Sequence, residues 1–267
     1  GPIRELKPFA FQVKAGKKVA VPCDYQLKNN QVSFAFPAGY DVSLPLTIDP
    51  TVIGATLAGS DVSRAFGHSA TFDNGGNIYT AGISFGVGYP TTMGAFAEMY
   101  TGGLVDVAIS KFNADGSDLL YSTYIGGTDR EYPYSTVVDD NGQLSFLGST
   151  LSRNYPTTEN AFQDNYRGNS DIIVTKLRAD GAMLAGSTLL GGSDADGINN
   201  SPFSSGGADS YRGEIILDNS GNVYIATCSQ SGNFPVTANA PQQTIDEGGQ
   251  ISLAQDGIVA KLNSDLS

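Results

Sequence analysis

The sequence predicts an all-β protein: a β-propeller of four-stranded antiparallel blades, preceded by a small β segment. Three short motifs recur in the same order along the chain, and self-similarity at such a period is typical of stacked supersecondary units. The first motif is an Asp-x-x-Gly turn that begins at Asp73, Asp139 and Asp218, in steps of 66 and 79 residues. A second observation is that no stretch carries the apolar stripe of an amphipathic helix. Both observations favour repeated sheets over a helical or mixed fold.

The second and third motifs follow the turn in every repeat. Tyr89–Phe96 (YPTTMGAF) returns as Tyr155–Phe162 (YPTTENAF) and, more loosely, as residues 234–241 (FPVTANAP). The third motif opens with Asp and continues as a short apolar alternation; its copies are residues 106–116, 171–181 and 256–266. The constant order of the three motifs indicates that each repeat folds in the same way.

Four short strands are expected in the middle repeat, because β-branched residues and period-two alternation recur there. The predicted strands are Ser135–Val138, Leu144–Ser149, Asp171–Lys176 and Leu184–Leu189. The Asp-x-x-Gly motif between the first two strands is typical of a β-hairpin turn, since Gly adopts a positive φ and the Asp side chain accepts hydrogen bonds from the nearby backbone. Four antiparallel strands repeated radially make a propeller blade.

The domain organisation follows from the repeats. Residues 1–50 form the N-terminal β segment and residues 51–267 the propeller repeats, with units at about 56–122, 123–187 and 188–267. Residues 52–57 align with the fourth strands of the later repeats, so they are expected to close the C-terminal blade and to remove an exposed edge. Three repeats are fewer than the usual four to eight blades, which favours a partial propeller.

The combined motifs resemble a known family, the SBBP-type β-propeller repeat. The resemblance rests on Thr123–Gly127, Asp139–Gly142, Gly148–Thr150, Tyr155–Thr158 and the spacing of Asp171 and Lys176. Pro8–Gln12, Gly39–Asp41 and Leu46–Pro50 look like the tail of the β-rich domain that commonly precedes such repeats. Two positions depart from the pattern. The first repeat has only Gly59 where the second has Gly126 and Gly127, and the third repeat has Pro241 where the others have Phe. The resemblance implies an exported bacterial protein, extracellular or at the cell surface, of which this chain is one part, and it brings no catalytic residues.

The composition excludes some classes of binding partner. The formal net charge is −12 and the Lys and Arg residues form no run, which argues against nucleic acid as a partner. No apolar stretch is long enough for a membrane-spanning helix, so membrane insertion is not expected. Cys23 and Cys228 are expected to be buried, unpaired thiols, although an oxidising compartment would permit a disulfide between them.

Catalytic chemistry has little support in the sequence. The single histidine, His68, lies at a variable position before a first strand, and no nucleophile elbow or metalloprotease motif is present. We therefore expect a non-enzymatic protein. The alternative is a carbohydrate-active enzyme, a polysaccharide hydrolase or lyase, that uses paired carboxylates.

Calcium is the one cofactor that the sequence suggests. Asp194 and Asp196, followed by Gly197 and Asn199, resemble the opening of a calcium loop, but the twelfth position is Ser205 rather than a bidentate Glu. A solvated acidic loop is the competing interpretation.

Aromatic residues supply the candidate ligand-binding side chains. Tyr89, Tyr155 and Phe234 repeat in register and are expected to pack inside the fold. The non-repeating aromatics Tyr132, Tyr134, Tyr166 and Phe203 are better candidates for recognising a glycan or a surface protein. The sequence therefore predicts a binding or scaffolding module, with a purely structural spacer as a further alternative.

Overall fold

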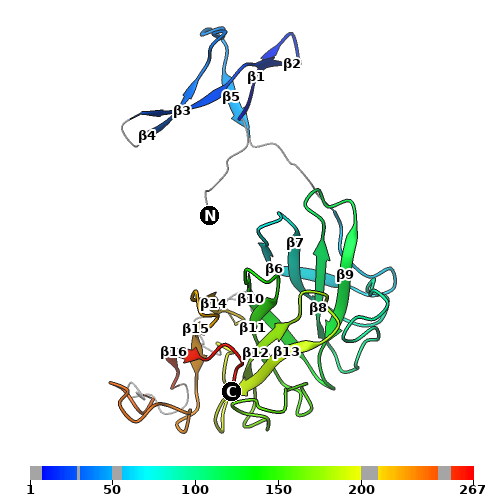
Figure 1. Ribbon diagram of the computed structural model, residues 1–267, viewed down its shortest axis with the longest axis vertical. Helices are drawn as coiled ribbons and strands as arrows, with labels where there is room; N and C mark the ends of the chain where they lie inside the picture. Colours follow the sequence, from blue (N-terminus) through cyan, green and yellow to red (C-terminus); the bar gives the residue numbers. More distant parts are fainter. Residues whose placement is uncertain (1–7, 29–30, 50–55, 200–209, 246–253) are drawn as a thin grey trace. The chain divides into compact units, whose positions relative to one another are not determined.

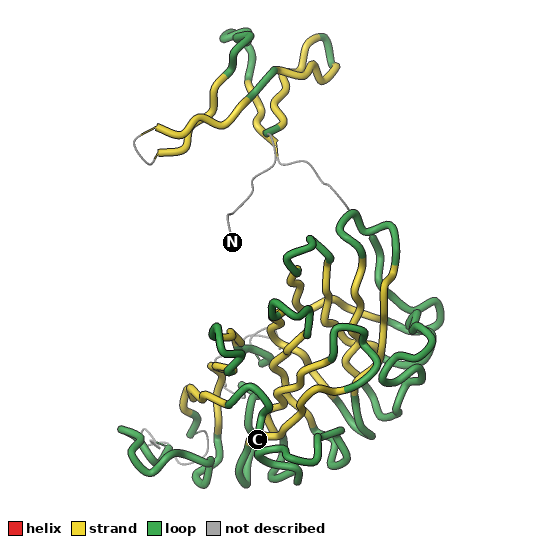
Figure 2. Tube along the Cα trace, viewed as in Figure 1, coloured by secondary structure: helices red, strands yellow, loops and turns green. Residues whose placement is uncertain are grey.

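The computed structural model describes residues 8–28, 31–49, 56–199, 210–245 and 254–267, and the described chain is strands, turns and loops (Figures 1 and 2). The chain divides into two compact units, residues 1–55 and 56–267, which are considered separately. No helix in the described ranges is long and apolar enough to span a membrane. The predicted all-β class is confirmed.

The N-terminal unit contains a three-stranded sheet and a hairpin. Strands β1 (Phe9–Lys14), β2 (Lys17–Val21) and β5 (Leu46–Asp49) form the sheet in the order β2-β1-β5, and β3 (Asp24–Lys28) pairs with β4 (Gln31–Ala35). Its small core is built on Ala10, Val21 and Cys23. Cys23 is buried and Cys228 is partly buried in the other unit, and both thiols are free.

The second unit contains three antiparallel sheets that repeat one strand order. The first holds β6 (Ala65–Phe72), β7 (Ile78–Ser84), β8 (Asp106–Phe112) and β9 (Leu119–Ile125). The second holds β10 (Glu131–Val138), β11 (Leu144–Thr150), β12 (Asp171–Leu177) and β13 (Leu184–Leu190). In the third, the described strands are β14 (Glu214–Leu217), β15 (Val223–Ser229) and β16 (Asp256–Leu262). The four strands predicted for the middle repeat are confirmed, with the first beginning four residues earlier.

The repeated turn fixes the hairpin between the first two strands of each sheet. Asp139 Oδ1 accepts hydrogen bonds from the backbone N–H groups of Asn141 and Gln143, both at 2.9 Å, and Gly142 has a φ of 76°. Asp73 and Asp218 make the same pair of bonds in the other sheets. The carboxylate therefore replaces a backbone acceptor, and Gly takes the left-handed conformation that other residues rarely adopt.

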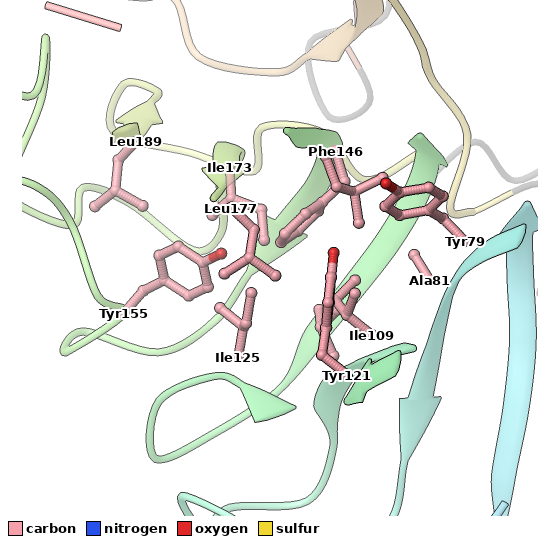
Figure 3. Packing of buried hydrophobic residues seen from close by; sticks show 12 residues of the cluster. Tyr79, Ala81, Ile109, Tyr121, Ile125, Phe146, Tyr155, Ile173, Leu177 and Leu189 are labelled. Atoms are coloured by element: carbon pink, nitrogen blue, oxygen red, sulfur yellow. The ribbon is translucent and has the colours of Figure 1, made fainter. Parts of the chain in front are cut away.

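Apolar side chains fill the spaces between neighbouring sheets. One core cluster joins the first and second sheets, and Figure 3 shows Tyr79, Tyr121 and Phe146 converging in it. A second cluster joins the second and third sheets around Tyr134, Val174 and Ile225. The first strands are also neighbours, because β10 contacts both β6 and β14. The sheets thus lie face to face in sequence order, with their first strands on the same side.

Candidate functional site

A pair of buried carboxyl groups lies where the first sheet meets the second. Asp106 is the first residue of β8, Glu131 is the first residue of β10, and both are 0% exposed. A Cβ atom on Gly126 would lie closer than 3.0 Å to both carboxyl groups, so a larger residue here would displace them. The linker between the sheets therefore brings an acidic side chain of each sheet to one point.

In this pair, both oxygens of Glu131 and one oxygen of Asp106 accept hydrogen bonds. Asp106 Oδ2 accepts a hydrogen bond from the Thr101 N–H at 2.8 Å, whereas Asp106 Oδ1 has no partner among the described residues. Glu131 accepts from the Gly127 N–H at 3.0 Å and from the Thr150 hydroxyl at 2.6 Å. Burial raises the pKa of Asp106 to about 6, and burial, with a smaller contribution from the charge of Asp106, raises the pKa of Glu131 to about 7.

The junction between the second and third sheets repeats this arrangement. Asp171 opens β12, and Asp196 precedes the third sheet; both are 0% exposed and flank Gly191 as the first pair flanks Gly126. Asp171 Oδ2 accepts from the Gln163 amide at 2.8 Å and from the Arg167 N–H at 2.9 Å, while its Oδ1 again has no described partner. Burial raises the pKa of Asp171 to about 7 and also raises the pKa of Asp196.

Asp196, like its counterpart Glu131, has hydrogen-bond donors on both carboxyl oxygens. Its carboxylate accepts from the Ser229 and Ser231 hydroxyls and from the Gly192 N–H at 2.7 Å. These donors all belong to the third sheet or to the linker leading into it. The carboxyl pairs therefore connect each sheet to the next.

The predicted calcium ligands are not arranged as a cation site. Asp196 is buried in the junction, whereas Asp194 is exposed, with its backbone N–H bonded to the Ser231 hydroxyl at 2.9 Å. Within the described ranges, no three His, Cys, Asp or Glu side chains are grouped to hold a metal ion. Asp194 faces solvent whereas Asp196 faces the junction between the sheets, so the two carboxyl groups are not brought to one point.

The aromatic residues predicted to bind a ligand lie in different places in the structure. Tyr132 and Tyr134 come together with Tyr211: the rings of Tyr132 and Tyr211 stack at 4.0 Å, and Tyr134 lies 6.4 Å from Tyr211. Tyr134 is a core residue whose hydroxyl bonds Ser149 and the Gly197 carbonyl, which leaves it no surface for a ligand. Tyr132 and Tyr211 are partly exposed.

The remaining predicted residues lie apart from this tyrosine pair. Tyr166 packs against the first core cluster with Arg153 over its ring at 5.8 Å, and Phe203 lies outside the described residues. His68 is exposed on β6, at a register shift of that strand. Tyr89 and Tyr155 are buried as predicted, and their hydroxyls bond Ser110 and Thr175.

Two features were missed from the sequence. Asp106 and Asp171 open the third motif of their repeats and accept bonds from the backbone, but Glu131 and Asp196 were not identified from the sequence as their partners. The constant spacing of 25 residues within each pair is the signal that would have found them. The second feature is a groove of about 620 Å³ along β16.

Comparison with known proteins adds one finding for the N-terminal unit. A family described as a domain of unknown function, DUF7948, matches residues 1–51. No curated protein matches the chain.

Proposed function

We propose that residues 56–267 belong to a β-propeller that acts as a non-catalytic binding or scaffolding module of an exported bacterial protein. The observation that carries this proposal is the repeated junction, in which successive sheets meet through the same buried carboxyl pair and the same adjacent first strands. Radial repetition of four-stranded sheets is how propellers are built. The resemblance to SBBP-type repeats supports both the propeller and the extracellular or cell-surface location.

The binding surface in this proposal includes the stacked pair Tyr132 and Tyr211. Both rings are partly exposed at the junction of the second and third sheets. Tyrosine offers a large amphipathic contact area and loses little conformational entropy on binding, which suits a glycan or a protein surface. The net charge of −12 favours a neutral or basic partner over an acidic one.

A carbohydrate-active enzyme is less well supported by the geometry. Glycoside cleavage needs two carboxyl groups on either side of the scissile bond, in contact with the sugar. Both carboxyl pairs described above are instead 0% exposed, so substrate cannot reach them. Their placement suits the joining of sheets.

The test is a glycan, polysaccharide and surface-protein array probed with the full chain, with calcium and with a chelator, followed by analysis of the same wells for cleavage products. The proposal predicts saturable binding without product. Tyr132→Ala combined with Tyr211→Ala should weaken binding about tenfold, a typical loss for an aromatic anchor, while Met93→Ala, at a position 96% exposed, serves as the control. Cleavage products, or no binding to any probe, would contradict the proposal, and loss of binding with chelator would restore the calcium hypothesis for Asp194 and Asp196.

A further inference from the structure

We propose that the junction of the first and second sheets binds a primary carboxamide, the group that ends a glutamine side chain. The second and third repeats carry Gln163 and Gln242 at a position where the first repeat carries Ala97. The first repeat therefore lacks a group for which the other repeats provide hydrogen-bond partners. This inference does not depend on the tyrosine surface proposed above.

The partners of Gln163 define what the position accepts. This side chain is 4% exposed, and its Nε2 donates to the Asn165 carbonyl at 2.9 Å and to Asp171 Oδ2 at 2.8 Å. Its Oε1 accepts from the Gly191 N–H at 3.2 Å, in the linker to the third sheet. Both bonds of Nε2 recur around Gln242 in the third repeat. The amide is therefore a repeated part of the structure.

The loop that carries this position has the same backbone frame in the first two repeats. The Gln163 N–H donates to the Thr188 hydroxyl at 3.0 Å, and the Ala97 N–H donates to the Thr123 hydroxyl at 2.9 Å. Later in the loop, the Thr101 N–H bonds the Asp carboxylate of its own repeat, and the residue in the same place of the second repeat does likewise. The Cβ atom of Ala97 therefore points toward the place that the Gln163 amide takes in its own repeat.

The partners that an amide would need are present in the first junction. Gly126 takes the place of Gly191; it is buried, and its N–H has no hydrogen-bond partner among the described residues. The Met99 carbonyl and Asp106 Oδ2 take the places of the two acceptors of Gln163. A buried N–H without an acceptor costs free energy. One donor and two acceptors match the carbonyl and the NH₂ group of a primary carboxamide.

The tyrosines beside this position do not replace the amide. Tyr124 belongs to the core cluster against which Ala97 packs. Its hydroxyl accepts from the Tyr89 N–H at 2.9 Å and donates to the Gly86 carbonyl at 3.2 Å. The Tyr100 hydroxyl is buried and has no hydrogen-bond partner among the described residues. The junction thus holds a further polar group that a ligand could satisfy.

Charge and access narrow the class of ligand. Ala97 is partly exposed, so a small molecule can reach the position from solvent. A carboxylate ligand would add a negative charge beside Asp106 and Glu131 and has no N–H to donate. A metal cation offers no acceptor to the Gly126 N–H. A neutral group that both donates and accepts satisfies all of these partners.

Acetamide is the probe, because it has the same atoms as a glutamine side chain beyond Cβ. Titration of the isotope-labelled full chain should move the Gly126 amide signal in the NMR spectrum saturably, with a Kd of about 1–20 mM, the range open to so small a ligand. N,N-dimethylacetamide keeps the carbonyl but has no N–H, so it should bind at least about fivefold more weakly.

Two variants test the position itself. Ala97→Gln should supply the amide from within the chain, abolish the response of Gly126 to acetamide and raise the melting temperature by about 2–4 °C. Met93→Gln, at a position 96% exposed in the same loop, is the matched control and should change neither. Gln163→Ala should open the same site in the second repeat, so that acetamide moves the Gly191 signal in this variant and not in the wild type.

A Gly126 signal that about 100 mM acetamide does not move, equal binding of the two amides, or a response that survives Ala97→Gln would overturn the proposal. Water or another glutamine of the chain held at the Gly126 N–H would give the first of these results. Two further ligands distinguish the source of the carboxamide. Tighter binding of N-acetylglutamine methylamide would assign it to a polypeptide, and tighter binding of free glutamine would assign it to an amino acid.

Discussion

Replacing Glu131 with glutamine should stabilise the protein at alkaline pH and leave it unchanged or weaker at acidic pH. Glu131 is 0% exposed, and its pKa rises from an ordinary 4.5 to about 7 in the fold. A group whose pKa is raised on folding stabilises the fold below its unfolded pKa, and that contribution is lost as the pH rises through the folded value. A pKa shift of this size lowers the free energy of unfolding by about 3 kcal/mol between pH 4 and pH 8.

Glutamine has nearly the same shape as glutamate but carries no charge, so the stability of the variant does not fall as the pH rises through the pKa of Glu131. Its carbonyl can accept from the Gly127 N–H as Glu131 does, and its amide can face the Thr150 hydroxyl. We expect a gain of about 1–3 kcal/mol at pH 8, which corresponds to a melting temperature higher by about 2–10 °C for a unit of this size.

The assay is thermal unfolding by circular dichroism at half-unit steps from pH 5 to pH 8. Glu159→Gln, a change at an exposed carboxylate, is the matched control and should follow the wild-type curve. The second carboxyl pair still titrates in the variant, so the pH dependence should become shallower rather than vanish. A variant that is less stable than the wild type at pH 8, or that keeps the full wild-type pH dependence, would refute the reasoning.

Three further substitutions test the junctions and the turns, each by denaturant unfolding. Gly126→Ala places a Cβ against the Asp106 carboxyl group and should destabilise by about 1–3 kcal/mol, more than Gly59→Ala, where the space is open; equal effects would contradict the close approach. Tyr155→Phe removes the bond to the Thr175 hydroxyl and should lower the free energy of unfolding by about 1 kcal/mol, so no change would mean that this bond contributes nothing. Asp139→Ala leaves two turn N–H groups without their acceptor and should lose about 1 kcal/mol, which asparagine at the same position should largely restore.

The all-β class and the strands could be predicted from the sequence because their determinants are local. The Asp139 turn and the strand Asp171–Leu177 depend on neighbours in sequence, and both are present in the structure. The packing of Tyr89 and Tyr155 was predictable for a related reason, since residues that repeat in register occupy repeated positions.

The carboxyl junctions could not be predicted by the same reasoning. Asp106 and Glu131 meet because the linker folds back so that the Glu131 N–H bonds the Val105 carbonyl, a contact between two sheets. The place of Tyr134, a predicted recognition residue, depends on a distant partner too: its hydroxyl donates to the carbonyl of Gly197, 63 residues away. Local patterning carries no information on such partners, although the shared spacing of the two acidic pairs does.

A crystal structure of the full chain would show whether the repeated sheets pack face to face through sealed carboxyl pairs. We expect β10 between β6 and β14, with Asp106 against Glu131 and Asp171 against Asp196, and all four carboxyl groups closed to solvent. Sheets joined in another order would contradict this packing, and a pair open to a solvent-filled cleft would make its carboxylates candidates for catalysis.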